Sequence, residues 1–164
     1  MTDLDPQRDT AQILANSSLG GELDADECQT LAARMNLLSL QAGETLINED
    51  EERCTLFVLA RGRLCVCKTV GGVEETVYQM RPGECAGTRA FVDGKPRRAA
   101  LRAEGPVSVL TLEPEDFDAL VETHPRLVFK VMRAIFRITH SNLMRMNLES
   151  AEMRNYLLKS GGRY

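Results

Sequence analysis

Between Leu37 and Leu112 the sequence repeats one pattern, a short apolar run followed by a turn signal. The apolar runs are LLSL, TLFVLA, RLCVCKTV, EETVYQM, RAALRA and VSVLTL, and glycine or proline stands between most of them. Strands of this length at roughly ten-residue spacing are typical of an antiparallel sandwich or roll. Gly71-Gly72 suits the tight turn of a hairpin between two of these strands. The pattern predicts an α+β protein built on an antiparallel, jelly-roll-like β-roll.

Helical patterns lie on both sides of the strand region. A short helical stretch is expected near Gln12 to Ala15 in an otherwise polar segment. Asp24 then fits a helix N-cap, because Glu27 follows three positions later as in a capping box. After the strands, Pro114 suits the first turn of a short helix. The expected division is a polar segment over residues 1–17, a domain over 18–159 with its roll at about 37–112 and C-terminal helices at about 114–159, and a tail over 160–164.

From Arg126 to Lys159 the chain runs without proline or glycine. Such a stretch predicts a helix of about 30 residues, roughly 45 Å long. Because a domain of this size cannot cover so long a helix, we expect the inner half to pack on the roll and the outer half to need a partner. The residues near one stripe of this helix are Val128, Val131, Ile135, Ile138, Asn142, Met146 and Met153, with Leu143 and Leu157 beside it.

Charge is distributed unevenly along the 164 residues. Residues 1–52 hold 12 acidic and 2 basic side chains, whereas residues 53–164 hold 12 acidic and 18 basic ones. Binding of the whole chain to nucleic acid is therefore not favoured, but a local anion site in the second part is compatible with this balance. Four bases share one face of the long helix and are expected to meet solvent, an acidic partner or the acidic first 52 residues; they are Arg126, Lys130, Arg133 and Arg137.

Several classes of protein are disfavoured by what the sequence lacks. It has no apolar run of membrane-spanning length and no basic, apolar leader, so we expect a cytoplasmic protein. The five cysteines form no CxxC pair, and the two histidines, His124 and His140, lie far from them, so reduced thiols and no metal are expected. The usual catalytic motifs are absent, which predicts that the chain is not an enzyme.

The most informative segment is PGECAGTRAFVDGKPRRAALRA, residues 82–103. It lies between two expected strands and places glycines before a short helical turn, whose backbone N–H groups suit a phosphate. An arginine returning from the next strand would add a bidentate partner, and Pro96 fixes the chain just before it. The features indicate an anion site, or else a loop carrying basic, solubilising residues.

These residues resemble the cyclic nucleotide-binding domain, as found in bacterial catabolite-type regulators, cyclic-nucleotide-gated channels and kinase regulatory subunits. The resemblance runs from about Leu19 to Lys159. It implies a β-roll of about eight strands, helices at both ends, and a long helix that closes over the ligand or pairs with a second copy. The motifs that carry it are Ala42-Gly43-Glu44-Thr45-Leu46, the strand and glycine turn from Leu56 to Leu64, Arg81-Pro82-Gly83, and Pro96-Arg97-Arg98-Ala99 at the end of the phosphate-binding cassette.

The cassette departs from the family at defined positions. The family's Phe-Gly-Glu triplet, whose glutamate holds the ribose 2′-hydroxyl, falls on Ala86-Gly87-Thr88, and a family glycine is replaced by Asp50. Arg97 matches the arginine that pairs with the cyclic phosphate. Polar residues midway along the long helix either touch the nucleobase or sit in a helix–helix seam. The resemblance implies a ligand site made of Gly87, Thr88, Arg89, Ala90, Arg97, Arg98, Ala99, Thr139 and Asn142.

The resemblance implies a ligand-sensing regulatory module for cAMP, cGMP or a related small anion. A hydrogen bond to a charged carboxylate contributes roughly 1.5–3 kcal/mol, so its loss at Thr88 predicts binding weakened by about 10- to 100-fold. The alternative is a degenerate roll that binds nothing and serves as a dimerisation or protein-docking module. We expect a homodimer through the long helix, with a protein partner as a further candidate. Because only five residues follow Lys159, no helix-turn-helix and no direct DNA binding are expected.

Overall fold

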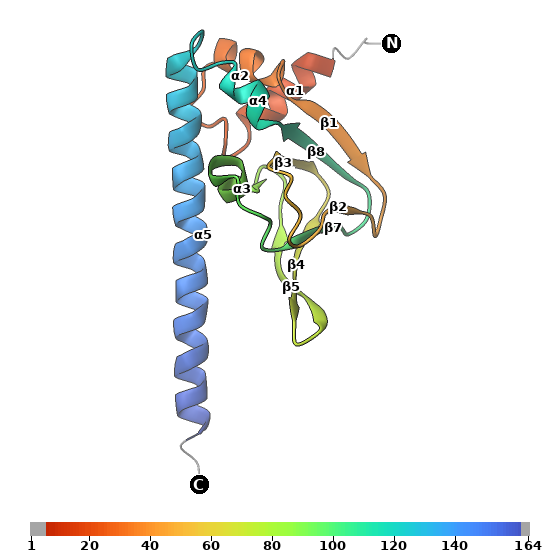
Figure 1. Cartoon of the computed structure of the whole chain (residues 1–164), viewed down its shortest axis with the longest axis vertical. Coiled ribbons are helices and arrows are strands. Elements are labelled where there is room, and N and C mark those ends of the chain that lie inside the picture. The colour runs from red at the N-terminus through yellow and green to blue at the C-terminus, as the bar shows by residue number, and fades with distance from the viewer. Residues whose placement is uncertain (1–5, 162–164) are drawn as a thin grey trace.

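The computed structural model describes residues 6–161 and contains two four-stranded antiparallel sheets, which confirms the predicted β-roll. One sheet has the order β1-β8-β3-β6 and the other the order β2-β7-β4-β5 (Figure 1). The strands are β1 (Asn36–Leu40), β2 (Thr45–Ile47), β3 (Leu56–Arg61), β4 (Leu64–Val70), β5 (Val73–Met80), β6 (Cys85–Ala86), β7 (Ala100–Ala103) and β8 (Val107–Leu112).

The β4–β5 hairpin turns at the expected glycine pair. Gly71 and Gly72 have φ of 59° and 82°, and Val70 pairs with Val73 across the turn. Positive φ at both central residues matches the twist of the two strands, and only glycine adopts it freely. The turn chemistry therefore fixes the register of the longest pair of strands in the roll.

Five helices accompany the two sheets in the described chain. Helices α1, α2 and α4 lie together at one end of the roll, beside the start of α5, and α3 lies between β3 and α5 (Figure 1). The helices are α1 (Pro6–Ala15), α2 (Ala25–Ala32), α3 (Thr88–Asp93), α4 (Pro114–Asp118) and α5 (Pro125–Ser160). As expected, Pro114 lies in the first turn of α4.

The N-terminal helices belong to the packed domain. Helix α1 begins at Pro6, earlier than Gln12, and Leu14 and Ser17 are buried. The segment expected to be polar over residues 1–17 thus carries a helix with a core side chain. Residues 1–5 of that segment and residues 162–164 of the expected tail lie outside the described residues. The capping box at α2 is present, since Asp24 Oδ1 accepts the Glu27 N–H at 2.8 Å.

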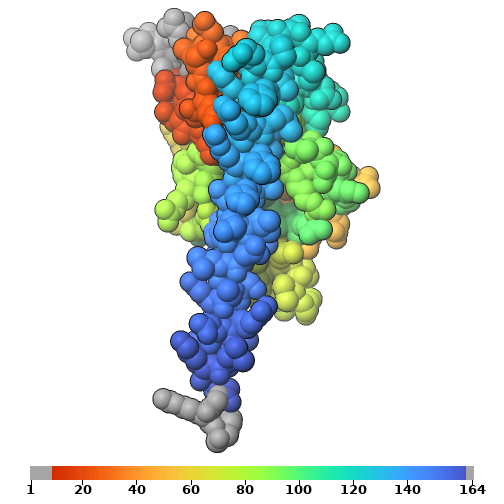
Figure 2. All heavy atoms as spheres, turned by 90° about the vertical axis from the view of Figure 1, so that its left-hand side faces the viewer, coloured from red at the N-terminus to blue at the C-terminus, as the bar shows by residue number. Residues whose placement is uncertain are grey.

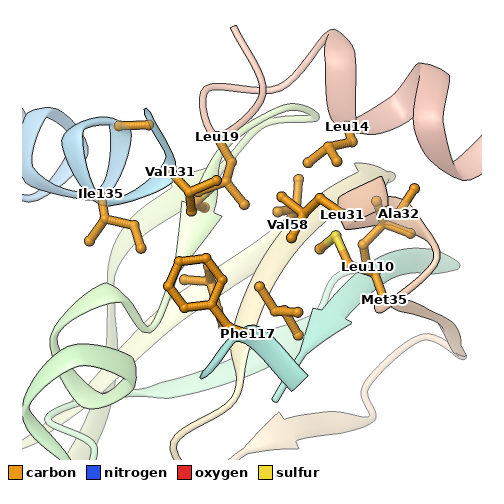
Figure 3. Close-up of a cluster of buried hydrophobic side chains, with 14 of the residues drawn as sticks. Leu14, Leu19, Leu31, Ala32, Met35, Val58, Leu110, Phe117, Val131 and Ile135 are labelled. Carbon is orange, nitrogen blue, oxygen red and sulfur yellow. The ribbon is translucent and has the colours of Figure 1, made fainter. Parts of the chain in front are cut away.

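Two hydrophobic clusters hold the molecule together. The first joins the N-terminal helices, α4 and the inner half of α5 to one face of the β1-β8-β3-β6 sheet. Its members include Leu14, Leu31, Val58, Phe117 and Val131 (Figure 3). The second fills the inside of the roll. Its buried members are Leu46, Ile47, Phe57, Leu59, Leu64, Met80, Leu101, Ala103, Val107 and Val109.

Helix α5 has 36 residues and divides into two halves. At 1.5 Å per residue it is about 54 Å long. The inner half buries Leu127, Val131, Ala134 and Ile135 in the first cluster. The outer half buries no side chain, and its last turns project past the β4–β5 hairpin (Figures 1 and 2). The stripe predicted from sequence is buried only in its first part, since Met146 and Met153 are exposed.

Three bases of α5 meet the acidic N-terminal part of the same chain. Lys130 Nζ lies 2.8 Å from Glu27 Oε2, and Arg133 Nη2 lies 2.6 Å from Glu22 Oε2. Arg137 also pairs with Glu22. Contact with the first 52 residues is thus observed for three of the four bases of this face, and the fourth, Arg126, is exposed to solvent. The ion pairs hold the inner half of α5 against the N-terminal helical region.

Candidate functional site

The cassette forms a turn, a short helix and a returning loop. Strand β6 ends at Ala86, Gly87 takes φ of 84°, and α3 follows at once from Thr88. Gly94, with φ of 66°, ends this helix before the loop that leads to β7. Gly83, with φ of 92°, also lies in this segment, so all three of its glycines stand where the backbone turns left-handed.

Arg97 returns toward the start of α3, as the sequence predicts. Its side chain is only 6% exposed. The Nε–H donates to the carbonyl oxygen of Arg53 at 2.8 Å, and Nη2 donates to the carbonyl oxygen of Thr55. The guanidinium carbon lies 5.3 Å from the centroid of the Phe57 ring. Two carbonyls and one aromatic face thus fix the orientation of this buried cation.

The guanidinium of Arg97 lies directly against Gly87. A Cβ built on Gly87 would lie 2.0 Å from Arg97 Nη1 and 2.9 Å from the Thr55 carbonyl oxygen, so no side chain fits there. Glycine at this position therefore serves two purposes, a positive φ and room for the arginine. The cation consequently faces the first turn of α3.

No carboxylate of the described residues forms an ion pair with Arg97. Burial lowers the pKa of its guanidinium, but arginine stays protonated in proteins. A buried cation is strongly disfavoured unless an anion compensates it. The arrangement is therefore suited to an anionic ligand at the start of α3.

The backbone of Arg97 is held by an acidic loop. Its N–H donates to the carbonyl oxygen of Glu51 at 2.9 Å, and its carbonyl accepts the N–H of Asp50 at 2.8 Å. Asp50 is the one non-glycine residue with positive φ in the described part of the chain, at 65°. Glycine adopts this conformation freely, which agrees with the glycine that the family resemblance predicts at this position.

Replacing Asp50 by glycine should raise the free energy of unfolding by about 0.5 kcal/mol. A left-handed backbone costs a non-glycine residue roughly 1–2 kcal/mol, and the greater unfolded-state entropy of glycine offsets part of the gain. Urea denaturation measures the change. The matched control is Glu52→Gly, two residues further on, where the backbone is not left-handed and stability should fall. A less stable Asp50→Gly variant would contradict this account of strain.

Thr88 and Thr139, two of the predicted site residues, lie together. Their hydroxyl oxygens are 2.9 Å apart, which joins α3 to α5 across 51 positions in the sequence. A groove of about 230 Å³ runs along this contact between the two helices. Thr88, Arg89, Val92, Met132, Phe136 and Thr139 are among the residues that line it.

The remaining candidates occupy different surroundings. Ala90 is buried within α3, and Ala99 is half-buried. Arg89 is exposed and lies 4.0 Å from Asp93 on its own helix. Arg98 and Asn142 are exposed. The structure therefore brings Gly87, Thr88, Arg97 and Thr139 close to the first turn of α3, and leaves Arg98 and Asn142 on the surface.

Sequence reasoning missed the residues that position Arg97. Thr55 is 1% exposed, and its hydroxyl donates to the Glu113 carboxylate at 2.8 and 2.9 Å while its carbonyl receives Arg97. Arg53 supplies the second carbonyl. Arg97 reaches backbone carbonyls 42 and 44 positions away, and the contact between the Thr55 and Glu113 side chains spans 58 positions, so no local motif marks them.

Residues 6–161 offer no group of three or more histidine, cysteine, aspartate or glutamate side chains that could hold a metal ion. The five cysteines are free thiols, and burial raises the pKa of Cys85 to about 11. Among the described helices, none combines the length and the apolar character needed to cross a membrane.

Residues 37–124, more than half of the chain, match the family described as the cyclic nucleotide-binding domain. The chain belongs to this family. The family is a ligand-binding domain, which agrees with the prediction that the chain is not an enzyme.

Individual relatives support the same assignment. The chain is 27% identical over 118 residues to cGMP-dependent protein kinase 2 of Homo sapiens, covering 70% of this chain and 16% of the kinase. It is 31% identical over 91 residues to the cAMP-dependent protein kinase regulatory subunit of Emericella nidulans, covering 56% of this chain and 22% of that subunit. The chain thus spans less than a quarter of either protein. A cyclic nucleotide-binding domain from Methylobacillus flagellatus shares the fold, with a TM-score of 0.76 at 20% identity over 85% of this chain and 79% of that one.

Proposed function

We propose that this chain is a ligand-sensing module that binds cAMP or cGMP through the cyclic phosphate. The observation that carries the proposal is Arg97, a buried guanidinium held by backbone carbonyls and placed against Gly87. Within residues 6–161 it has no carboxylate as an ion-pair partner. A cyclic phosphate is an anion that accepts several hydrogen bonds, so it supplies both the charge and the acceptors that this site lacks. The related kinase proteins are named for these two nucleotides.

The binding signal has a direct route to α5. Helix α3 begins at the phosphate site, and its Thr88 contacts Thr139 on α5. A ligand that stabilises one arrangement of α3 therefore changes the energy of the α3–α5 contact. This contact gives the module a regulatory output through its long helix. We place the protein in the cytoplasm, since free thiols suit a reducing compartment.

A thermal-shift series with cAMP, cGMP, AMP, GMP and inorganic phosphate tests the proposal. A ligand at 100 times its dissociation constant adds about 2.7 kcal/mol of stability, which for a chain of this size raises Tm by roughly 5–10 °C. We expect such a shift with one or both cyclic nucleotides and little with the linear ones. No shift with any ligand would refute binding and would favour the alternative of a roll that serves only for dimerisation or protein docking.

A second proposal concerns assembly, and the exposed face of α5 favours it. Phe129, Phe136 and Leu143 are seven residues apart, and Met132 and Met146 each follow one of them by three positions. Met153 and Leu157 fall on the same two heptad positions, with Thr139 and Ser150 at the intervening ones. All seven apolar side chains are more than one-third exposed. The pattern is that of a coiled-coil seam, which a second copy of the same helix would cover. We call these seven residues the α5 seam.

The charges beside the α5 seam fit a parallel pair of helices. Glu149 and Arg154 are five positions apart and flank the seam on opposite sides. In a parallel two-stranded coiled coil, residues with this separation face each other across the interface, so each glutamate would lie opposite an arginine of the other copy. The proposed assembly is therefore a homodimer with parallel α5 helices at its centre.

A further inference from the structure

We propose that Thr88 docks α3 onto α5 instead of reading the ribose, so that the site selects its ligand by the cyclic phosphate and tolerates loss of the 2′-hydroxyl. The proposal rests on the nucleotide-binding function above and narrows its ligand class to cyclic phosphate esters without a required 2′-hydroxyl. In this proposal Thr139, which lies outside the cassette, is a positioning residue for α3.

Both hydroxyl hydrogens of the two threonines are engaged without a ligand. The Thr139 hydroxyl lies 2.9 Å from the Thr88 hydroxyl and 2.8 Å from the carbonyl oxygen of Ile135. A carbonyl oxygen only accepts, and each hydroxyl carries one hydrogen, so the two hydrogens of the pair serve these two contacts. Thr88 is 8% exposed, which places its side chain in the contact between the helices and not on an open surface.

The length of the side chain leads to the same conclusion. A glutamate carries its oxygens two bonds further from Cβ than a threonine carries its hydroxyl, so Thr88 reaches less far than the glutamate that the family places here. It also lacks the charge that makes a carboxylate a strong acceptor. A 2′-hydroxyl that gains no strong partner in the site contributes little to affinity, because water offers it equivalent hydrogen bonds.

Helix α5 is the fixed member of the pair. Ile135, one turn before Thr139, is 3% exposed in the core, and the ion pairs to Glu22 and Glu27 hold the same half of the helix. Helix α3 has six residues and ends in left-handed glycine at both sides. A short helix between two flexible points depends on its tertiary contacts for a defined position, and the Thr88–Thr139 contact supplies one at its first residue.

Ligand preference tests the specificity half of the inference. By calorimetry, the dissociation constants of cAMP and 2′-deoxy-cAMP for the unaltered protein should agree within about threefold. Thr88→Glu removes the docking hydroxyl for both ligands alike, so the readout is the preference for cAMP over 2′-deoxy-cAMP. This preference should rise by about tenfold or more, because only cAMP has the hydroxyl that a carboxylate would accept. A tenfold or greater preference of the unaltered protein for cAMP would overturn this half.

Hydrogen exchange of the ligand-free protein tests the docking half without any nucleotide. Thr139→Val keeps the shape and removes the hydroxyl, so amide exchange in residues 88–93 should accelerate by about two- to tenfold. Thr139→Ser keeps the hydroxyl and should restore the original rate. Unchanged exchange in Thr139→Val, or equal acceleration in both variants, would overturn the docking role. Because this readout needs no ligand, failure of all nucleotides to bind would count against the proposed function alone.

Discussion

Replacing Arg97 by alanine should weaken cyclic nucleotide binding by about 30- to 150-fold. A charge-assisted, bidentate pair with phosphate contributes roughly 2–3 kcal/mol, and each 1.4 kcal/mol is a factor of ten. Arg97→Lys should recover only part of the loss, since an ammonium retains the charge but not the planar fork. Calorimetric titration with cAMP or cGMP measures both variants.

The matched control for this experiment is Arg98→Ala. It removes the same charge from the neighbouring position, but its side chain is exposed. Exposed charges are well screened by salt, so we expect a change of less than about threefold. Equal losses in the two variants would indicate a diffuse electrostatic effect. Unchanged affinity in Arg97→Ala would remove the phosphate role from this residue.

The strand region could be predicted because its signals are local. Each strand is a short apolar run, each break carries glycine or proline, and the hairpin at Gly71-Gly72 needs only its own two residues. The capping box at Asp24 and the start of α4 at Pro114 are local in the same sense. The N-terminal boundary of the packed domain was harder to predict. Helix α1 begins at Pro6 and contributes Leu14 to a core whose other members lie up to 121 positions away in the sequence.

The candidate site likewise has one part that local sequence predicts and another that depends on distant contacts. Gly87 and Arg97 were found from a spacing within one segment, but their mutual contact depends on Thr55 and Arg53 from another loop. The pairing of Thr88 with Thr139 depends on how α5 crosses α3, which no local pattern encodes. Likewise, charge alone left three partners open for the basic face of α5, and the position of Glu22 in the fold selects one.

The phase of the long helix shows a further limit of the sequence argument. One apolar stripe was expected to serve both halves of α5. The structure has one stripe facing the core, ending near Ile135, and a second, exposed seam that starts at Phe129 beside it. Both are apolar at helical spacing, so periodicity alone does not assign either to the core or to a partner. Only the packing of the inner half separates them.

Introducing a charge into the α5 seam should separate the two copies of the proposed homodimer. Met146 is 59% exposed in the single chain and lies at a position where, in a parallel pair, the same residue of each copy would face the other. Met146→Glu would bring two unpaired carboxylates together in an apolar interface, which costs several kcal/mol, so association should weaken by at least about 100-fold.

Met144→Glu is the matched control, because Met144 is 56% exposed on the same helix but lies outside the seam. Its charge would remain in water, so association should be unchanged, and the two variants have the same composition. Light scattering at micromolar concentration should give twice the chain mass of 18.2 kDa for the unaltered protein and for Met144→Glu, and the single mass for Met146→Glu. A single mass for the unaltered protein would refute the dimer. Equal dissociation of both variants would refute the seam as its interface, because only one of the two introduced charges faces the proposed partner.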